Sequence, residues 1–218
     1  MEKTKLDYHP SSVIALRKET GEVLMGVYTE GYHSKIYIGS ANLLGGNPTK
    51  EDKSPLEVLT REINEEFANP PANRGNIWTK AQNIKEIRMA LQHNQPYADF
   101  FFEITKMGGV KHTPCRGICS VFISYIPQEI FEKIRISILN GEKIMSEGAA
   151  GIFAIRDLIK GGLYSTANTT PPILSEYFGV EIPKPDEVTA VRMVTPVRDS
   201  FRDYMEEFEY AGTTRFVQ

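Results

Sequence analysis

The segment from Ser54 to Phe67 constrains the fold more than any other part of the chain, because its helix signals agree with one another. Ser54 suits the N-cap, Pro55 suits the first helical position, and Glu57 completes a capping box. The Asn-Pro-Pro run at residues 69–71 ends the helix. Apolar residues recur at spacings of three and four, which predicts a buried stripe formed by Leu56, Leu59, Ile63 and Phe67.

The same predicted helix carries three glutamates, Glu62, Glu65 and Glu66, on one face. Like charges at these spacings destabilise an isolated helix by roughly 0.2–0.5 kcal/mol per pair. Mg²⁺ or Mn²⁺ would remove this repulsion, because hard cations bind carboxylate oxygens. The pattern therefore indicates either a divalent-metal site or a solvated acidic face on a surface helix.

The stretch from Gly45 to Glu66 resembles the Nudix box of the Nudix hydrolase family, which has the form G-x5-E-x7-R-E-U-x-E-E-x-G-U with U a bulky apolar residue. The run Arg-Glu-Ile-Asn-Glu-Glu at residues 61–66 matches the second half without a gap. In the first half, Lys53 stands where the family has glutamate. The spacing from Gly45 to Glu51 fits the opening of the box, so a two-residue insertion would let Glu51 replace that glutamate.

The resemblance continues outside the box, over residues 11–178. Residues 12–17 and 21–25 look like the family's first hairpin, and residues 36–38 look like the strand that enters the box. Residues 147–158 resemble its closing strand and helix. The resemblance implies an α/β fold, a Nudix-like α/β/α sandwich with a mixed β-sheet.

Periodicity predicts the elements between the box and the closing strand. Strands are expected over residues 84–91, 97–104 and 118–126, and a helix follows from about residue 127 to 139. A further helix begins near Thr169. These elements complete the expected sandwich.

We expect two parts in the chain: a Nudix-like domain over residues 1–178 and a C-terminal extension over residues 179–218. A strand is predicted over residues 188–194 and a helix over residues 197–208. The helix carries an apolar stripe formed by Phe201, Tyr204, Met205 and Phe208. Burying each of these side chains contributes about 1.5–3 kcal/mol. The extension should therefore be folded, either against the core or in a homodimer interface.

Nudix enzymes hydrolyse a nucleoside diphosphate linked to another group, and the resemblance implies this reaction here. Water attacks a phosphorus of the pyrophosphate, so the enzyme must neutralise charge and orient the water. The resemblance implies Mg or Mn as cofactor and a small-molecule nucleotide as substrate. It makes Glu62, Glu65 and Glu66 the metal-facing residues, and it lets Glu62 or Glu66 take part in activating the water.

The resemblance assigns roles to four further residues. Arg61 would orient the glutamates. Gly45 and Gly46 would allow the backbone to approach the metal or the phosphates closely. Glu147 precedes the closing strand and is either an additional acidic ligand or an exposed loop residue.

Lys53 motivates an alternative function, a Nudix-like nucleotide-binding or regulatory module without activity. A lysine beside the carboxylates could occupy the place of a cation and weaken metal binding. A third alternative is a structural protein that assembles through its C-terminal helix. The sequence does not identify the nucleotide, although loops over residues 28–37 and 69–83 contain aromatic side chains suited to stacking on a base.

Composition and charge exclude several classes of protein. The 218 residues are 41% hydrophobic and 24% charged, which is typical of a folded domain. The net charge of −3 gives no support for nucleic-acid binding. No apolar run is long enough to cross a membrane, and the first ten residues lack an apolar targeting segment, so we expect a cytoplasmic protein. Cys115 is expected to be a loop thiol and Cys119 a core thiol.

Overall fold

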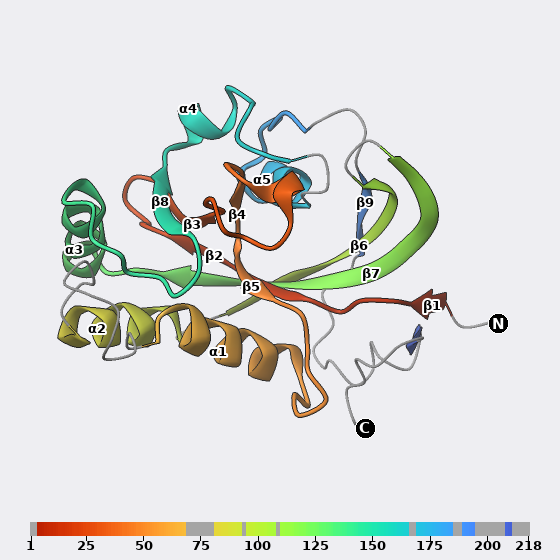
Figure 1. The fold of residues 1–218 in the computed structure, drawn as a ribbon, viewed down its shortest axis with the longest axis horizontal. Helices are drawn as coiled ribbons and strands as arrows, with labels where there is room; N and C mark the ends of the chain where they lie inside the picture. The colour runs from red at the N-terminus through yellow and green to blue at the C-terminus, as the bar shows by residue number, and fades with distance from the viewer. Residues whose placement is uncertain are drawn as a thin grey trace.

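The computed structural model describes residues 4–68, 81–92, 95–107, 110–165, 169–184, 189–194 and 208–210. These residues form a mixed α/β fold in which a curved sheet carries helices on both faces (Figure 1), so the expected α/β class with a mixed sheet is confirmed. The strands are β1 (Thr4–Leu6), β2 (Ser11–Leu16), β3 (Val23–Val27), β4 (Ala41–Asn42), β5 (Leu44–Gly46), β6 (Gln95–Met107), β7 (Val110–Tyr125), β8 (Ala149–Phe153), β9 (Thr189–Val194) and β10 (Phe208–Tyr210). The helices are the 3-10 turn η1 (Lys35–Tyr37), α1 (Pro55–Glu66), α2 (Ala81–Leu91), α3 (Gln128–Leu139), α4 (Ile155–Leu158) and α5 (Thr170–Phe178).

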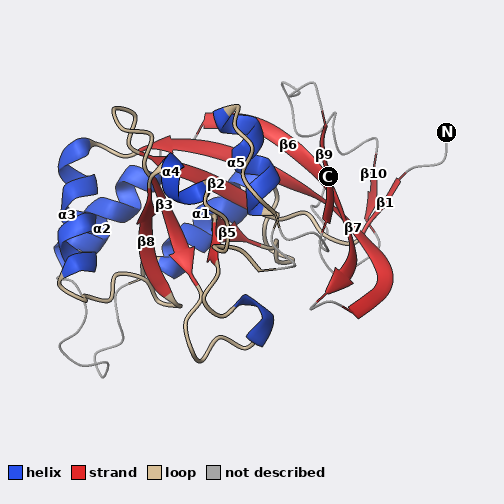
Figure 2. Ribbon diagram, turned by 90° about the horizontal axis from the view of Figure 1, so that it is seen from above, coloured by secondary structure: helices blue, strands red, loops and turns tan. Residues whose placement is uncertain are grey.

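The main sheet has the strand order β4-β3-β2-β7-β6-β9. Strand β2 lies at its centre and pairs with β7 in parallel along its whole length. It pairs in antiparallel fashion with β5 through its first half and with β3 through its second half. Strand β8 pairs with β3, and the long strands β6 and β7 curve together at one end of the molecule (Figure 2). This arrangement brings β5, and the loop that leads from it to α1, against the middle of the sheet.

Two apolar cores lie on opposite faces of the sheet. Figure 1 shows α1 and α2 below the sheet and α4 and α5 above it. The lower core joins α1 and α2 to α3 through the fully buried side chains Leu59, Ile63, Phe67, Ile84, Leu91, Phe131 and Ile134. The upper core packs α4 and α5 on the sheet through Leu158, Ile173, Leu174, Val23 and Phe100.

Helix α1 begins as its sequence predicts. The Ser54 hydroxyl accepts a hydrogen bond from the Glu57 N–H at 3.2 Å, and the Glu57 carboxylate accepts one from the Lys53 N–H at 2.9 Å. The predicted stripe is wrong at one position, because Leu56 is 47% exposed while Val58 is fully buried. Val58 therefore takes the place of Leu56 on the buried face of the helix, beside Leu59 and Ile63.

Two predicted strands are wrong. Residues 84–91 lie within α2, where Ile84, Ile87 and Leu91 are buried on one helical face. Their spacings of three and four are a helical period, and this tertiary packing outweighs the β-branched content that favoured a strand. Residues 36–38 overlap the turn η1 instead of forming a strand, and β4 and β5 follow it.

The described parts of the C-terminal region pair with other strands. The strand predicted over residues 188–194 is β9, which pairs with β6 at the edge of the main sheet. Strand β10 pairs with β1, and Phe208 of the predicted aromatic stripe belongs to it. The rest of the predicted helix over residues 197–208 lies outside the described residues, and the boundary at residue 178 stays a prediction. None of the described helices combines the length and apolarity needed to cross a bilayer.

His9, a buried residue just before β2, forms a hydrogen bond with the neighbouring strand β7. The side chain of His9 is inaccessible to solvent, and its Nε2 lies 3.0 Å from the Ser120 hydroxyl on β7. The Asp99 carboxyl on β6 also hydrogen-bonds to that hydroxyl. Burial lowers the pKa of His9 to about 3, because the charged imidazolium would lose its hydration. His9 is therefore neutral in the folded protein at physiological pH.

This predicts acid destabilisation. Below pH 6.5 the unfolded chain binds a proton at His9 that the folded protein does not bind until about pH 3. Stability should therefore fall as pH decreases through this window, by about 2 kcal/mol between pH 7 and pH 5. Urea unfolding at both pH values should show this loss in the wild type and a smaller loss in His9→Gln. Equal losses in the two proteins would contradict the assignment.

Candidate active site

A cleft of about 870 Å³ opens beside the C-terminal half of α1. One end of this cleft, the acidic end, is lined by Gly45, Gly46, Glu62, Glu66 and Glu147. These residues come from β5, from α1 and from the loop before β8. The structure thus brings together two of the glutamates predicted on the helix, the glycines of β5 and the more distant Glu147.

The two glycines are required by close contacts with β2 and α1. Gly45 has a φ of 136°, and a Cβ there would lie 2.1 Å from the Ser11 carbonyl oxygen. A Cβ on Gly46 would lie 2.4 Å from Cδ of Glu62. Gly45 therefore permits the pairing of β5 with β2, and Gly46 leaves the space that the Glu62 carboxylate fills.

Arg61 links the loop after β5 to the glutamates of α1. Its Nη2 donates to the Asn47 carbonyl oxygen at 2.7 Å and lies 2.9 Å from Oε1 of Glu62. The same guanidinium binds the Asp52 carboxylate through Nε and Nη2, at 3.1–3.3 Å. Its Nη1 lies 3.2 Å from Oε2 of Glu65. Arg61 therefore forms an ion pair that holds the Glu62 carboxylate in place.

Asp52, which was not predicted as a site residue, is the acidic residue of this loop that binds Arg61, whereas Glu51 does not. Asp52 is 5% exposed and also accepts a hydrogen bond from the Thr49 N–H at 2.7 Å. Burial raises its pKa, but the hydrogen bonds from Thr49 and Arg61 outweigh this and hold the pKa below its ordinary value. Glu51 is exposed. The position of Asp52, an acidic residue directly before Lys53, is the sequence signal that could have identified it.

Glu66 is a buried carboxylate beside two other acids. Its Oε2 is inaccessible to solvent and has no hydrogen-bond partner, while the backbone N–H of Glu147 donates to the carboxylate. Burial, and then the charges of Glu147 and Glu62, raise the pKa of Glu66 to about 7. Burial also raises the pKa of Glu62, against the opposing effect of Arg61. Negative charge is therefore concentrated at this end of the cleft.

The C-terminus of α1 holds the loop that carries Glu147. Ser146 donates its N–H to the Glu66 carbonyl oxygen and its hydroxyl to the Glu65 carbonyl oxygen, both at 2.7 Å. Carbonyl groups in the last turn of a helix lack intrahelical partners, so they are ready acceptors. These bonds place Glu147 next to Glu66, although Glu147 is itself exposed.

Glu65 does not join the other acids. Its side chain is 61% exposed, pairs with Arg61 and does not line the cleft. The helix turns by about 100° per residue, so Glu62 and Glu66 share a direction that Glu65 does not. Within the part of the chain that the structure describes, no three histidine, cysteine, aspartate or glutamate side chains are close enough together to hold a metal ion.

Aromatic side chains from the loop between β3 and β4 form another wall of the cleft. The ring centroids of Tyr28 and Tyr32 are 4.2 Å apart, and those of Tyr28 and Tyr37 are 5.3 Å apart. The Tyr28 hydroxyl accepts a hydrogen bond from the Asn42 amide at 3.0 Å. The nearby charges of Glu66 and Glu147 add to the burial that raises the pKa of Tyr28. The aromatic wall therefore adjoins the acidic end.

No protein-family model matches the chain, and no curated protein matches it. Similar solved structures include a bifunctional NMN adenylyltransferase/ADP ribose pyrophosphatase from Francisella tularensis, also solved complexed with AMP and Mn ion, at 11% identity and a TM-score of 0.41. The match covers 82% of this chain and only 42% of that one. The mMutator MutT protein from Bacillus halodurans matches at 12% identity and a TM-score of 0.41, over 85% of this chain and 97% of that one.

The position of Asp52 predicts a stability difference between adjacent acids. Asp52→Asn should destabilise the protein by about 1.5–3 kcal/mol, because it weakens charged hydrogen bonds to a buried group. Glu51→Gln is the matched control and should change stability by less than about 0.5 kcal/mol, as exposed substitutions do. Urea unfolding of both variants measures this. Similar effects from the two substitutions would show that Arg61 does not depend on Asp52.

The buried charge of Glu66 predicts that a neutral residue at this position stabilises the protein, whereas Asp52→Asn destabilises it. The folded-state pKa of about 7 exceeds the ordinary value of 4.5, so the contribution of this group to stability is lost as pH rises through that window. Without metal at pH 8, Glu66→Gln should therefore stabilise the protein by on the order of 1–3 kcal/mol. Exposed Glu65→Gln serves as control and should have little effect. A Glu66→Gln variant less stable than the wild type at pH 8 would refute the assignment.

Proposed function

We propose that the protein is a metal-dependent hydrolase that cleaves a pyrophosphate linkage in a nucleoside diphosphate derivative. The observation that carries the proposal is that Glu62, Glu66 and Glu147 line the same cleft, together with Gly45 and Gly46. This arrangement concentrates carboxylate oxygens along one part of the cleft. Such a site suits a cation-neutralised diphosphate.

The residues fit Mg²⁺ or Mn²⁺ by the chemistry of their donors. Mg²⁺ commonly binds through one or two carboxylates and completes its shell with water and substrate phosphates. Glu62 and Glu66 would hold the ion, with Glu147 beside them. The unpartnered Oε2 of Glu66 is a buried acceptor that such an ion would satisfy. Glu65 instead forms an ion pair with Arg61 and helps to hold its guanidinium in place.

A bound ion would polarise phosphoryl oxygens and lower the pKa of a bound water. The protein's own residues fix geometry and move protons. Arg61 holds the Glu62 carboxylate in place through Nη2. Either Glu62 or Glu66 would accept the proton of the attacking water, because both carboxylates face the cleft. Phosphoryl transfer asks for little covalent chemistry from the protein, so this positioning is its main contribution.

The position of Lys53 favours the hydrolase over a catalytically impaired binding module. The binding-module alternative requires a lysine that occupies the place of the cation. Lys53 is exposed and is not among the described residues that line the cleft. Its backbone N–H bonds to Glu57 at the start of α1. Lys53 therefore gives the metal no local competitor.

The test is a screen of the purified protein with Mg²⁺ or Mn²⁺ against ADP-ribose, dinucleotides, nucleotide sugars and nucleoside triphosphates. Glu62→Gln should reduce turnover on the order of a hundredfold, by analogy with the loss of one preorganised electrostatic group. Glu65→Gln, the control on the same helix, should reduce it much less. Lys53→Glu should change activity little.

Two results would overturn the proposal. Tight nucleotide binding with no product from any substrate would replace the hydrolase with the binding module. Activity that survives Glu62→Gln would show that the acidic end of the cleft is not where the reaction takes place.

A further inference from the structure

A series of hydrogen bonds connects the start of α5 to the Tyr28 hydroxyl in the wall of the cleft. The Thr170 hydroxyl accepts from the Leu43 N–H at 3.3 Å and donates to Oδ1 of Asn42 at 2.6 Å. Asn42 in turn donates through Nδ2 to the Tyr28 hydroxyl at 3.0 Å. Thr170, Asn42 and Tyr28 all line the cleft. We call these three residues the Tyr28 network.

The bond from Thr170 fixes which side of the Asn42 amide faces Tyr28. Thr170 is 1% exposed, so its hydroxyl hydrogen needs an acceptor within the protein, and Oδ1 of Asn42 supplies one. An amide whose oxygen is bound in this way presents its NH₂ group on the other side. Asn42 therefore acts toward Tyr28 as a donor.

The Tyr28 hydroxyl accepts a second hydrogen bond, from Tyr32. Burial raises the pKa of both tyrosines, and their shared bond raises the pKa of Tyr32 further while it opposes the rise at Tyr28. These directions identify Tyr32 as the donor and Tyr28 as the acceptor. A hydroxyl oxygen can accept two bonds and donate one. Because Asn42 and Tyr32 fill the two acceptor positions, Tyr28 can offer a ligand its own O–H as a donor.

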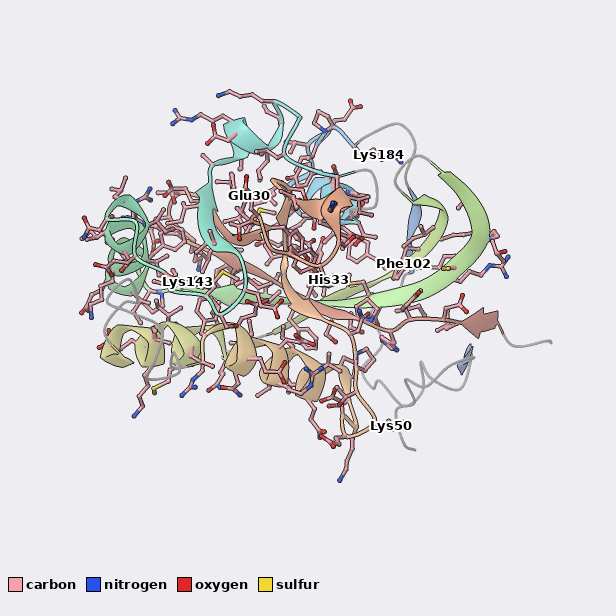
Figure 3. All side chains as sticks on the ribbon, in the orientation of Figure 1. Glu30, His33, Lys50, Phe102, Lys143 and Lys184 are labelled. Carbon is pink, nitrogen blue, oxygen red and sulfur yellow. The ribbon has the colours of Figure 1, made fainter. Side chains whose placement is uncertain are left out.

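The Tyr28 hydroxyl and the acidic residues border the same part of the cleft from different elements. Tyr28 directly follows β3, and the loop that carries Glu147 packs against that point of the chain. A Cβ on Gly148 would lie 2.4 Å from the Val27 carbonyl oxygen. The charges of Glu66 and Glu147 are close enough to act on Tyr28. Figure 3 labels His33 on the loop that begins at Tyr28, on the side of the sheet away from α1.

A diphosphate bound at the acidic end needs hydrogen-bond donors in addition to a cation. A metal ion at the glutamates would contact only some of the phosphate oxygens. Arg61 is the permanent cation in the described lining of the cleft, and three carboxylates already bind it. An O–H group that donates to an anionic oxygen forms a short, strong hydrogen bond. A donor that the fold already orients needs no reorganisation when the ligand binds.

We propose that the Tyr28 hydroxyl donates a hydrogen bond to a phosphate oxygen of the metal-bound diphosphate, and that Asn42, held by Thr170, is the positioning residue that keeps this hydroxyl a donor toward the substrate. The inference rests on the proposed function for the identity of the ligand. Diphosphate binding does not require cleavage. Binding and hydrolysis therefore test the two proposals separately.

The first test is calorimetry of methylenediphosphonate, a diphosphate analogue that cannot be hydrolysed, binding to the full-length protein with Mg²⁺. Tyr28→Phe removes the donor but keeps the ring, and it should weaken binding about tenfold, as the loss of a hydrogen bond to a charged group does. Tyr37→Phe is the matched control, because its ring lies 5.3 Å from that of Tyr28 while its hydroxyl is outside the Tyr28 network. Its affinity should stay within about twofold of the wild type. Equal affinity of Tyr28→Phe and the wild type, or no binding by the wild type, would overturn the inference.

The second test examines whether Asn42 acts through Tyr28. Asn42→Asp keeps the shape of the side chain but replaces the NH₂ donor with an acceptor, which should take the Tyr28 hydrogen and weaken binding about as much as Tyr28→Phe. The new charge also repels a phosphate, and the double variant Tyr28→Phe/Asn42→Asp measures that effect alone. Asn42→Asp should therefore weaken binding much less in the Tyr28→Phe background than in the wild type. Equal losses in the two backgrounds would overturn the positioning role of Asn42.

Hydrolysis of ADP-ribose with Mg²⁺ distinguishes this inference from the proposed function. If both hold, Tyr28→Phe should lower kcat/KM about tenfold. Methylenediphosphonate binding that depends on Tyr28, without product from any substrate in the screen, would refute the proposed function and support the inference. Hydrolysis that depends on Glu62, with methylenediphosphonate affinity unchanged in Tyr28→Phe, would support the proposed function and overturn the inference.

Discussion

Close contact at Gly45 and Gly46 is the constraint on which the acidic end of the cleft depends. Strand β5 is held so tightly between β2 and α1 that neither position has space for a Cβ. The pairing of β5 with β2 fixes the loop that leads into α1, and the gap at Gly46 receives the Glu62 carboxylate. A larger residue at Gly45 would collide with the backbone of β2, and a larger residue at Gly46 would displace the Glu62 carboxylate.

The same constraint concentrates charge that is unfavourable for stability. Glu66 is buried beside Glu62 and Glu147, and its raised pKa expresses the free energy required to ionise it there. The fold offsets part of this through Arg61, which binds Asp52, Glu62 and Glu65. Glu66 receives one opposing contact, the N–H of Glu147, and its Oε2 has no partner. Local instability of this kind is typical of functional sites, where stability is given up for reactivity.

Contacts between distant segments explain why parts of the site could not be predicted. The loop before β8 is fixed by bonds from Ser146 to the end of α1, about eighty residues away in sequence. Asp52 was overlooked because its role depends on where the Arg61 guanidinium lies in space. The strand predicted over residues 84–91 is wrong for a similar reason. The apolar residues of this short segment are compatible with a strand or with a helix, and packing against α1 and α3 decides for the helix α2.

The sequence by itself determined α1, its N-cap and the shared direction of Glu62 and Glu66. These features follow from local backbone geometry and from the helical period, which act over only a few residues. The tertiary structure alone decided that Gly45 and Gly46 must be glycine, that Asp52 and not Glu51 binds Arg61, and that Glu147 lies beside Glu66. The physical reason is that burial, ion pairing and cleft shape depend on which distant strands and loops meet, and that information is not contained in the spacing of neighbouring residues.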